Sequence, residues 1–368
     1  MLRRALMVML LFPALLLTGA STVRAPHFAV DPNWPRPLPT NWLFGQVSGV
    51  AVDGRDQLYV LHRPETISDD EKVGVECCVA APPVIIFDQQ GRIVRSFGGA
   101  RRGDHWPYRE HSIAVDARDG SLWIGGNGDQ DGFVVKYSAD GRFLMRIGAS
   151  GPTRGSNDTT QLGRPAGLAI DAVRRELYIA DGYANRRVIV FDADSGAYKR
   201  HWGAYGRVPS DAPVAQTMAA RRQHMMQPHG IALAADGSVY VGDRPNNRIQ
   251  VFDRRGTWLR DLIHVPTTGG GTGGATGSVG SVWDLALWPQ AVQTHLLVVD
   301  GSNNQVRLTD RRTNTVVASF GRAGPYAGQL RGAHAVAVDG NDAVYIAEVA
   351  TGRRVQRFRP TAEKESRQ

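Results

Sequence analysis

Short apolar runs separated by polar turns recur along almost the whole chain. The stretch "GIALAADGSVYVGDRPNNRIQVFD", which begins at Gly230, shows the arrangement: two apolar runs flank the turn "ADG", and a third run, "RIQVFD", follows. Runs of this length, rich in Val, Ile, Tyr and Phe and bounded by Gly, Asp and Asn, are typical of β-strands. Because runs with a helical period are scarce, the pattern predicts an all-β protein.

The same arrangement occurs six times, at a spacing of about 50 to 60 residues. The six units begin at Gly49, His111, Ala166, His229, Trp283 and His334. Most units contain a third and a fourth apolar run, so each unit reads as a four-stranded sheet. Six such units in series indicate a six-bladed β-propeller.

The sixth unit has no fourth run of its own, but the segment "HFAVDPNWP" at residues 27–35 can supply it. We therefore expect an N-terminal strand to close a single ring over residues 26–360, since closure removes free sheet edges. The longer segments between units are interpreted as loops on this one domain. Residues 361–368 are interpreted as a polar tail.

Residues 1–25 have the order of a signal peptide: Arg3 and Arg4, then the apolar run "ALMVMLLFPALLL", then small residues. That run is too short for a comfortable membrane span, and no other segment is apolar enough. We expect an exported protein, periplasmic or extracellular. The formal net charge of +8 includes three arginines in this segment, so without them it is +5. This mild excess does not indicate nucleic-acid binding.

The two cysteines of the chain, Cys77 and Cys78, are adjacent. Neighbouring Cα atoms lie about 3.8 Å apart, whereas disulfides usually join Cα atoms about 4.4–6.8 Å apart. We interpret the pair as two thiols or as one tight ring that braces a loop, and a redox or metal-binding role is the alternative. In both cases no framework of disulfides holds the fold together.

Histidine recurs at one position of the repeat. In the six units in order, the residue at the start of the first strand is Ser48, His111, Ala166, His229, Trp283 and His334. The three histidines thus lie in alternate units, about 120° apart in a six-bladed ring. First strands line the channel, so the imidazoles are expected to converge there and suit Zn²⁺ with an open fourth position. The alternative is three unrelated turn or core histidines.

Three more residues belong to the same frame. Arg63 and Arg244 end the second strands of units one and four, and Tyr183 follows the second strand of unit three. Two guanidiniums at the channel mouth suggest a carboxylate or another anion as ligand. A phenol beside a Lewis acid can act as a base. Taken singly, each of the three residues also fits an ordinary surface position.

With these residues, the chain resembles the peptidyl-α-hydroxyglycine α-amidating lyases, particularly bacterial relatives built from NHL repeats. The resemblance runs from about residue 45 to residue 360. It implies a six-bladed propeller that binds zinc and cleaves a peptidyl-hydroxyglycine into a peptide amide and glyoxylate. The positions that match the family's zinc ligands are His111, His229 and His334. Those that match its catalytic tyrosine and its two active-site arginines are Tyr183, Arg63 and Arg244.

The chain also departs from that family at three positions. Ala335 stands where the family has an Asp that ligates calcium, although Val50 and Ile113 match the backbone contacts of that ion. Without the carboxylate a hard divalent site is much weaker, so we expect little calcium binding. Ala184 replaces a disulfide-forming Cys, and Gly332 replaces a Met near the last histidine.

The sequence therefore favours a zinc-dependent lyase, acting on a peptide or a related small substrate at the channel mouth. We expect a monomer without a membrane span and without a nucleic-acid partner. A non-enzymatic NHL-repeat scaffold that binds a protein, glycan or other ligand is the alternative. A propeller lactonase is less favoured, because no set of four acidic residues occupies the strand starts.

Overall fold

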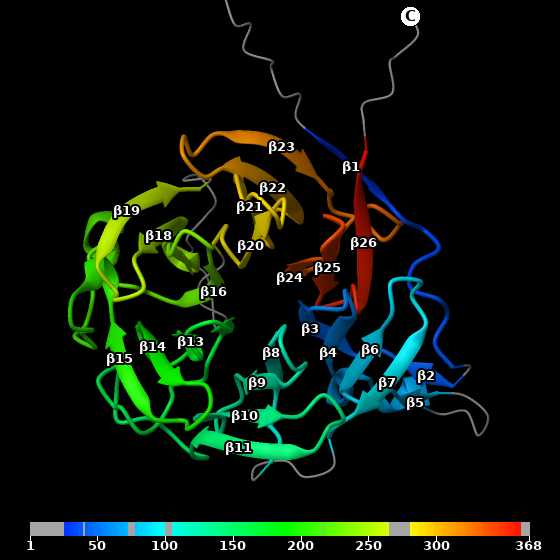
Figure 1. Ribbon diagram of the computed structural model, residues 1–368, viewed down its shortest axis with the longest axis horizontal. Helices are drawn as coiled ribbons and strands as arrows, with labels where there is room; N and C mark the ends of the chain where they lie inside the picture. The colour runs from blue at the N-terminus through cyan, green and yellow to red at the C-terminus, as the bar shows by residue number, and fades with distance from the viewer. Residues whose placement is uncertain are drawn as a thin grey trace, which may run out of the picture.

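The structure is a computed structural model that describes residues 26–39, 41–72, 78–99, 105–215, 217–264 and 280–361. Six four-stranded antiparallel sheets are arranged in a ring, each sheet forming one blade (Figure 1). The first strands of neighbouring blades contact one another in cyclic order, and that of blade six contacts that of blade one. The predicted six-bladed propeller is confirmed.

Within each blade, strands follow one another from the channel to the rim. Blade one consists of β3 (Gln46–Val52), β4 (Leu58–Arg63), β6 (Val84–Phe87) and β7 (Ile93–Phe97). Blade two consists of β8 (Glu110–Val115), β9 (Leu122–Gly126), β10 (Phe133–Tyr137) and β11 (Phe143–Gly148). Blade three consists of β12 (Gly167–Asp171), β13 (Glu176–Asp181), β14 (Arg187–Asp192) and β15 (Tyr198–Trp202).

The second half of the chain repeats the plan. Blade four consists of β16 (Pro228–Leu233), β17 (Val239–Asp243), β18 (Arg248–Phe252) and β19 (Trp258–Ile263). Blade five consists of β20 (Asp284–Trp288), β21 (His295–Asp300), β22 (Gln305–Asp310) and β23 (Val316–Phe320). Blade six consists of β24 (Ala333–Val338), β25 (Val344–Glu348), β26 (Arg354–Thr361) and β1 (His27–Val30).

The N-terminal strand β1 closes the ring, as expected. It pairs antiparallel with β26, with His27 opposite Thr361 and Val30 opposite Phe358. The Phe28 ring lies 4.6 Å from that of Phe320, between centroids, and so ties β1 to blade five as well. The strand covers four residues rather than the whole of residues 27–35. The chain then turns, and Trp34 packs between blades six and one.

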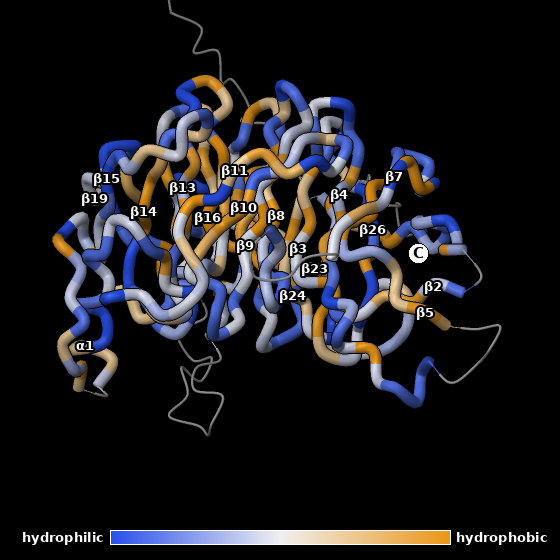
Figure 2. Tube along the Cα trace, turned by 90° about the horizontal axis from the view of Figure 1, so that it is seen from below, coloured by the Kyte–Doolittle hydropathy of each residue, from blue (hydrophilic) through white to orange (hydrophobic). Residues whose placement is uncertain are grey.

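The core lies between the blades. Second and third strands are almost entirely buried, because each blade packs against a neighbour on both of its faces. This explains why the sequence shows continuous apolar runs there rather than a strict alternation. Figure 2 shows the outcome from the side, with apolar strands in the interior of the ring and polar turns at its two ends.

Ion pairs with a buried acid join the second and third strands of four blades. In each, an acid that ends the second strand bonds an arginine near the start of the third. The pairs are Asp181–Arg187, Asp243–Arg248, Asp300–Arg307 and Glu348–Arg354. Such pairs contribute little net free energy when compared with apolar packing. Removal of one partner, however, leaves the buried charge of the other without a counter-ion. These ion pairs therefore fix the C-terminal ends of the second strands, next to which site residues such as Arg244 lie.

The remaining elements lie outside the six blades. The two-residue strands β2 (Trp42–Leu43) and β5 (Val79–Ala80) pair in parallel. The single α-helix is the four-residue α1 (Met218–Arg221), within the described residues. Short 3-10 helices are η1 (Pro64–Thr66), η2 (Asp69–Lys72), η3 (Ala204–Gly206) and η4 (Arg244–Asn246). No helix among the described residues has the length and hydropathy needed to cross a membrane.

Some predictions concern residues outside the described ranges. The signal peptide expected at residues 1–25 lies there, as does the polar tail beyond Thr361. Cys77 also lies there, whereas Cys78 is described and is disulfide-bonded. The interpretation of the pair as two free thiols is therefore wrong for Cys78, whereas the tight ring and the redox or metal-binding role stay predictions.

Candidate metal centre

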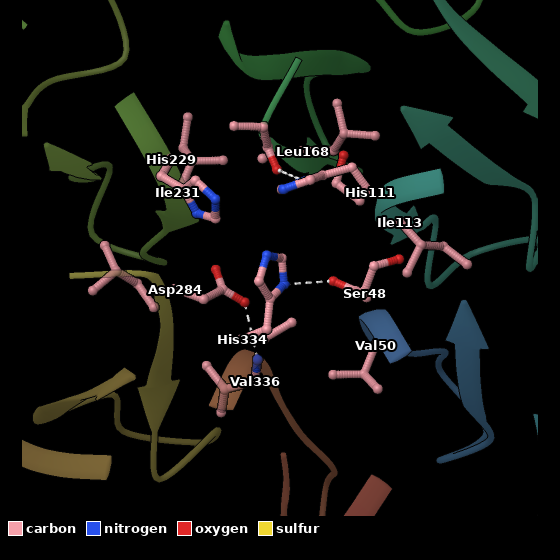
Figure 3. A pocket seen from close by; sticks show the side chains of 16 residues that line it. Ser48, Val50, His111, Ile113, Leu168, His229, Ile231, Asp284, His334 and Val336 are labelled. Carbon is pink, nitrogen blue, oxygen red and sulfur yellow. Dashed lines mark hydrogen bonds between the residues drawn. The ribbon is translucent and has the colours of Figure 1, made fainter. Parts of the chain in front are cut away.

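Three histidines converge at the centre of the ring (Figure 3). His111 lies on β8, His229 on β16 and His334 on β24, so alternate blades supply them. One ring nitrogen of each lies within 4.8 Å of the others, and each residue is at most 5 % exposed. The convergence expected from the repeat is therefore present in the structure.

A backbone irregularity turns each histidine toward the axis. In β8 the pairing register with β9 shifts between Glu110 and Ser112, and the corresponding shifts in β16 and β24 also bracket the histidine. A bulge of this kind redirects one side chain and interrupts the ladder locally. The histidines thus leave the packed faces of the blade and enter the central cavity, whose volume is about 90 Å³.

Each histidine is oriented by the next blade. Nδ1 of His111 is 2.9 Å from the Ala166 carbonyl oxygen. The equivalent contacts are His229 Nδ1 to the Trp283 carbonyl at 2.5 Å and His334 Nδ1 to the Ser48 carbonyl at 2.8 Å. A carbonyl can only accept, so Nδ1 carries the hydrogen in all three rings. Nε2 is then the unprotonated nitrogen, which is the form that binds a metal.

Burial keeps the imidazoles neutral. It is the largest cause of the lowered pKa of His334, about 3, and it is followed by the positive charges of Arg63 and Arg244. The pKa values of His111 and His229 also lie well below the ordinary value, again mainly because of burial. At neutral pH no proton therefore has to leave before a cation binds.

The structure brings Tyr183 into contact with this cluster. Its hydroxyl oxygen lies 2.8 Å from Nε2 of His111 and 3.2 Å from Nε2 of His229. The residue follows β13, and its backbone N–H donates to the Arg164 carbonyl across 3.3 Å. The phenol therefore faces the same nitrogens that would hold a metal.

The two arginines occupy equivalent positions, just after or at the ends of the second strands of blades one and four. Those blades lie opposite each other in a six-bladed ring. Arg63 donates from Nε to the Glu110 carbonyl at 2.6 Å and from a terminal nitrogen to Gln46 Oε1 at 3.0 Å. Arg244 stacks on the ring of Trp283, with 4.2 Å from its guanidinium carbon to the ring centroid.

Both arginines are buried, Arg63 to 3 % and Arg244 to 8 % exposure. Burial lowers the pKa of Arg63 to about 10 and also lowers that of Arg244. Both nevertheless remain protonated at neutral pH. Both charges act on His334 of the cluster. Buried guanidiniums favour a planar anion such as a carboxylate, which can bind them through two parallel hydrogen bonds.

Sequence reasoning missed the role of Trp283. Its indole N–H donates to the Gly280 carbonyl at 2.7 Å, and its ring stands edge-on to those of His229 and His334. A Cβ atom at Gly301 would lie 2.5 Å from the indole, so only glycine permits this placement. The signal was available, because Trp283 is the one bulky residue among the non-histidine members of the aligned positions.

A carboxylate in the channel was also missed. Asp284, the next residue after Trp283, lines the cavity and accepts the Val336 N–H across 2.9 Å. Burial raises its pKa to about 7. In the repeat it corresponds to Ala335, one blade further on, where the resembling family has its calcium-binding Asp. The channel thus has an acid on blade five, and weak calcium binding stays a prediction.

The residues present fit a transition-metal ion. Three neutral imidazoles with Nδ1 fixed by carbonyls are the usual protein ligands of zinc when a fourth position is left open. Calcium prefers six to eight oxygen ligands, which this nitrogen cluster does not offer. The arrangement can therefore hold a Lewis acid next to a phenol and two cationic side chains.

Comparisons with known proteins agree with the fold. The NHL repeat family profile matches residues 225–252, which lie mostly in blade four. The solved structure titled "Streptogramin B lyase structure" superposes with a TM-score of 0.54 at 11 % identity, covering 92 % of this chain and 98 % of that one. At this identity the likeness shows the propeller fold alone.

Two curated relatives carry related names. Peptidyl-glycine alpha-amidating monooxygenase B of Xenopus laevis is 24 % identical over 249 residues, which is 65 % of this chain but about a quarter (26 %) of the relative. Peptidyl-alpha-hydroxyglycine alpha-amidating lyase 2 of Drosophila melanogaster is 23 % identical over 342 residues, or 88 % of this chain and 73 % of the relative. The chain is a six-bladed propeller with an NHL repeat, and it is distantly similar to peptidyl-α-hydroxyglycine α-amidating lyases.

Proposed function

We propose that this protein is an exported zinc-dependent lyase that cleaves a peptidyl-α-hydroxyglycine, or a related small α-hydroxy-amide with a carboxylate. The products would be an amide and glyoxylate. The observation that carries the proposal is the position of the Tyr183 hydroxyl against Nε2 of His111 and of His229, with His334 completing the cluster. A propeller used only as a scaffold has no need of such a group.

A zinc ion bound by the three histidines would act as a Lewis acid toward the hydroxyl oxygen of the substrate. Arg63 and Arg244 would hold the substrate carboxylate, because both guanidiniums are buried and their charges act on His334 and Tyr183. The ring of Trp283 packs edge-on against those of His229 and His334. These contacts would orient the hydroxyl group toward Tyr183.

Tyr183, once its own hydroxyl proton has left, would take the hydroxyl proton of the substrate as a phenolate, and its contact with the histidine cluster supports this role. As a carbonyl bond forms between carbon and that oxygen, the bond from carbon to the amide nitrogen breaks, and its electron pair goes to nitrogen. Nitrogen then takes up one proton, which replaces the one lost by the hydroxyl group. The step needs neither water nor a redox partner, and its products are the amide and glyoxylate.

The proposal includes export, a monomeric state and a substrate bound at the channel mouth. It rests on the signal-like residues 1–25, on the closed ring and on the position of Tyr183, Arg63 and Arg244 beside the histidines. The closed ring bears on the monomeric state because a propeller leaves only short, protected sheet edges.

The test combines metal analysis with product detection. The purified protein should contain about one zinc per chain and should release glyoxylate from an N-acylated hydroxyglycine peptide. The control is the same protein stripped of metal by a chelator and then reloaded. Stoichiometric zinc without glyoxylate from any peptide of a broad panel would refute the lyase, and a protein that binds no metal would favour the scaffold.

A further inference from the structure

Two further arginines stand at the channel mouth beside the proposed site. Arg109 lies two residues before His111, and Arg164 lies two residues before Ala166. Both bond to the same residue of blade two: a terminal nitrogen of Arg109 is 3.2 Å from Asn127 Oδ1, and Arg164 Nε is 3.0 Å from the Asn127 carbonyl. Asn127 is buried, so it holds the two side chains close to each other.

The pair adjoins the reacting groups. The guanidinium carbon of Arg164 lies 5.9 Å from the centroid of the Tyr183 ring. Burial is the main cause of the lowered pKa of Arg63, and the positive charge of Arg109 is the next. The mouth therefore has a second pair of cations, separate from Arg63 and Arg244 and on the side of blades two and three.

The backbone at Arg164 is strained. Its φ is +63°, in the left-handed region that glycine adopts freely and that costs other residues free energy. The strained residue holds its carbonyl toward the Tyr183 N–H and its side chain over the phenol. A glycine would make the same backbone hydrogen bond without strain. A long cationic side chain thus occupies a backbone position that favours glycine, which points to a use for that side chain.

An acidic side chain already forms an ion pair with one of the two arginines. Asp129 Oδ1 lies 3.0 Å from a terminal nitrogen of Arg164, and the Asp129 side chain is 87 % exposed. An exposed ion pair of this kind is weak and is screened by salt. A carboxylate of a bound ligand can therefore compete with it for Arg164.

We propose that Arg109 and Arg164 form a second anion subsite, which selects substrates with an acidic side chain near the hydroxyglycine. The choice of a hydroxyglycine peptide as substrate rests on the proposed lyase function. Recognition of a carboxylate by the two arginines does not. Arg63 and Arg244 would bind the carboxylate of the reacting residue. The second pair would bind that of an aspartate or glutamate one or two residues before it.

The kinetic test compares two N-acylated hydroxyglycine peptides that differ only by Asp or Asn before the reacting residue, and two more with the change one residue earlier. The protein should show a KM about fivefold lower for the better Asp peptide, an advantage that falls as salt is raised. Arg109→Ala and Arg164→Gly should remove the difference in KM between the Asp and the Asn peptide. Equal KM values for Asp and Asn peptides at low salt would overturn the proposal.

Three variants separate recognition from folding. Arg164→Gly should melt no lower than the original protein, because glycine relieves the positive φ. Asp129→Asn should strengthen the acid preference, because it removes the competing carboxylate. Arg92→Ala, an exposed arginine paired with Asp88 on the outer part of blade one, is the matched control and should change nothing.

A binding measurement keeps the inference testable if no peptide is cleaved. Calorimetry with succinate, which has two carboxylates, and with acetate, which has one, does not depend on turnover. Tighter succinate binding that is lost in Arg164→Gly, without glyoxylate release from any peptide, would sink the lyase and support the subsite. Glyoxylate release, combined with succinate binding that is unchanged in Arg164→Gly, would support the lyase and overturn the subsite.

Discussion

The Tyr183 hydroxyl and Nε2 of His111 are joined by a hydrogen bond of 2.8 Å, across the boundary between blades two and three. Nδ1 of the same ring donates to the Ala166 carbonyl, so Nε2 has to accept and the phenol donates. A metal ion that takes Nε2 removes this acceptor. The Tyr183 oxygen would then lie beside the ion and be available to the substrate. Metal binding would thus depend on the histidines, and proton transfer on the tyrosine.

Tyr183→Phe should therefore lower kcat while the zinc content stays at the original level. Loss of one positioned acid–base group typically costs about 10²–10⁴-fold, and Phe keeps the ring that packs on His111 and His229. The measurements are glyoxylate release and elemental analysis of the same sample. A variant that keeps full activity would exclude the phenol from proton transfer.

The zinc content itself should depend on the three histidines. The double replacement His111→Ala and His229→Ala should abolish binding, because one remaining imidazole cannot retain the ion. His201→Ala with His295→Ala is the matched control, since these two histidines lie away from the channel, on β15 and β21. Elemental analysis after gel filtration measures the outcome, and zinc retained by the first double variant would contradict the site.

Closure of the ring by β1 should be visible as stability. Phe28→Ala removes the stacking on Phe320 at 4.6 Å and the edge-on contact with Trp288 at 5.5 Å, and should lower the free energy of unfolding by about 2 kcal/mol. Deletion of residues 26–40 should lower it more. His27→Ala is the control, because that side chain is exposed. Denaturant melts give the values, and a deletion that melts like the original would mean that β1 does not hold the ring.

Asp284 should give the metal-free protein a distinct pH dependence. Its folded pKa of about 7 lies above the ordinary value of 3.8, so the folded state holds a proton that the unfolded state has lost. Stability from this group is therefore present below pH 4 and is lost as the pH rises from 4 to 7. The change should be on the order of 2–4 kcal/mol.

Asp284→Asn is the variant that isolates this effect, because the amide can still accept the Val336 N–H. Measured in a chelator, the variant should gain stability over the original at pH 8 and match it near pH 4. The same pair of proteins can be melted with added calcium. A large rise in melting temperature for the original alone would contradict the expected weakness of calcium binding.

The repeat carried most of what could be predicted from the sequence. The fold followed from six units with the same strand order, and the closing strand followed from the incomplete sixth unit. The metal cluster followed from strict alternation, because residues in register share one depth in a ring. A lone histidine such as His229 would have given no such signal.

The contacts that orient the site could not be predicted in the same way. The carbonyls of Ser48, Ala166 and Trp283 belong to every residue type, so no letter of the sequence marks them as acceptors. The position of Asp284 depends on how blade five packs against blade six. Such relations between blades are set by packing and not by the pattern within one unit.

The three Nδ1 hydrogen bonds have a consequence for symmetry. They link blade two to three, four to five and six to one, so the six repeats are grouped into three pairs. A ring with sixfold architecture thereby acquires a threefold centre, which is the symmetry that three identical ligands require. A duplication that added or removed a single blade would break this pairing, whereas a change by two blades would preserve the alternation.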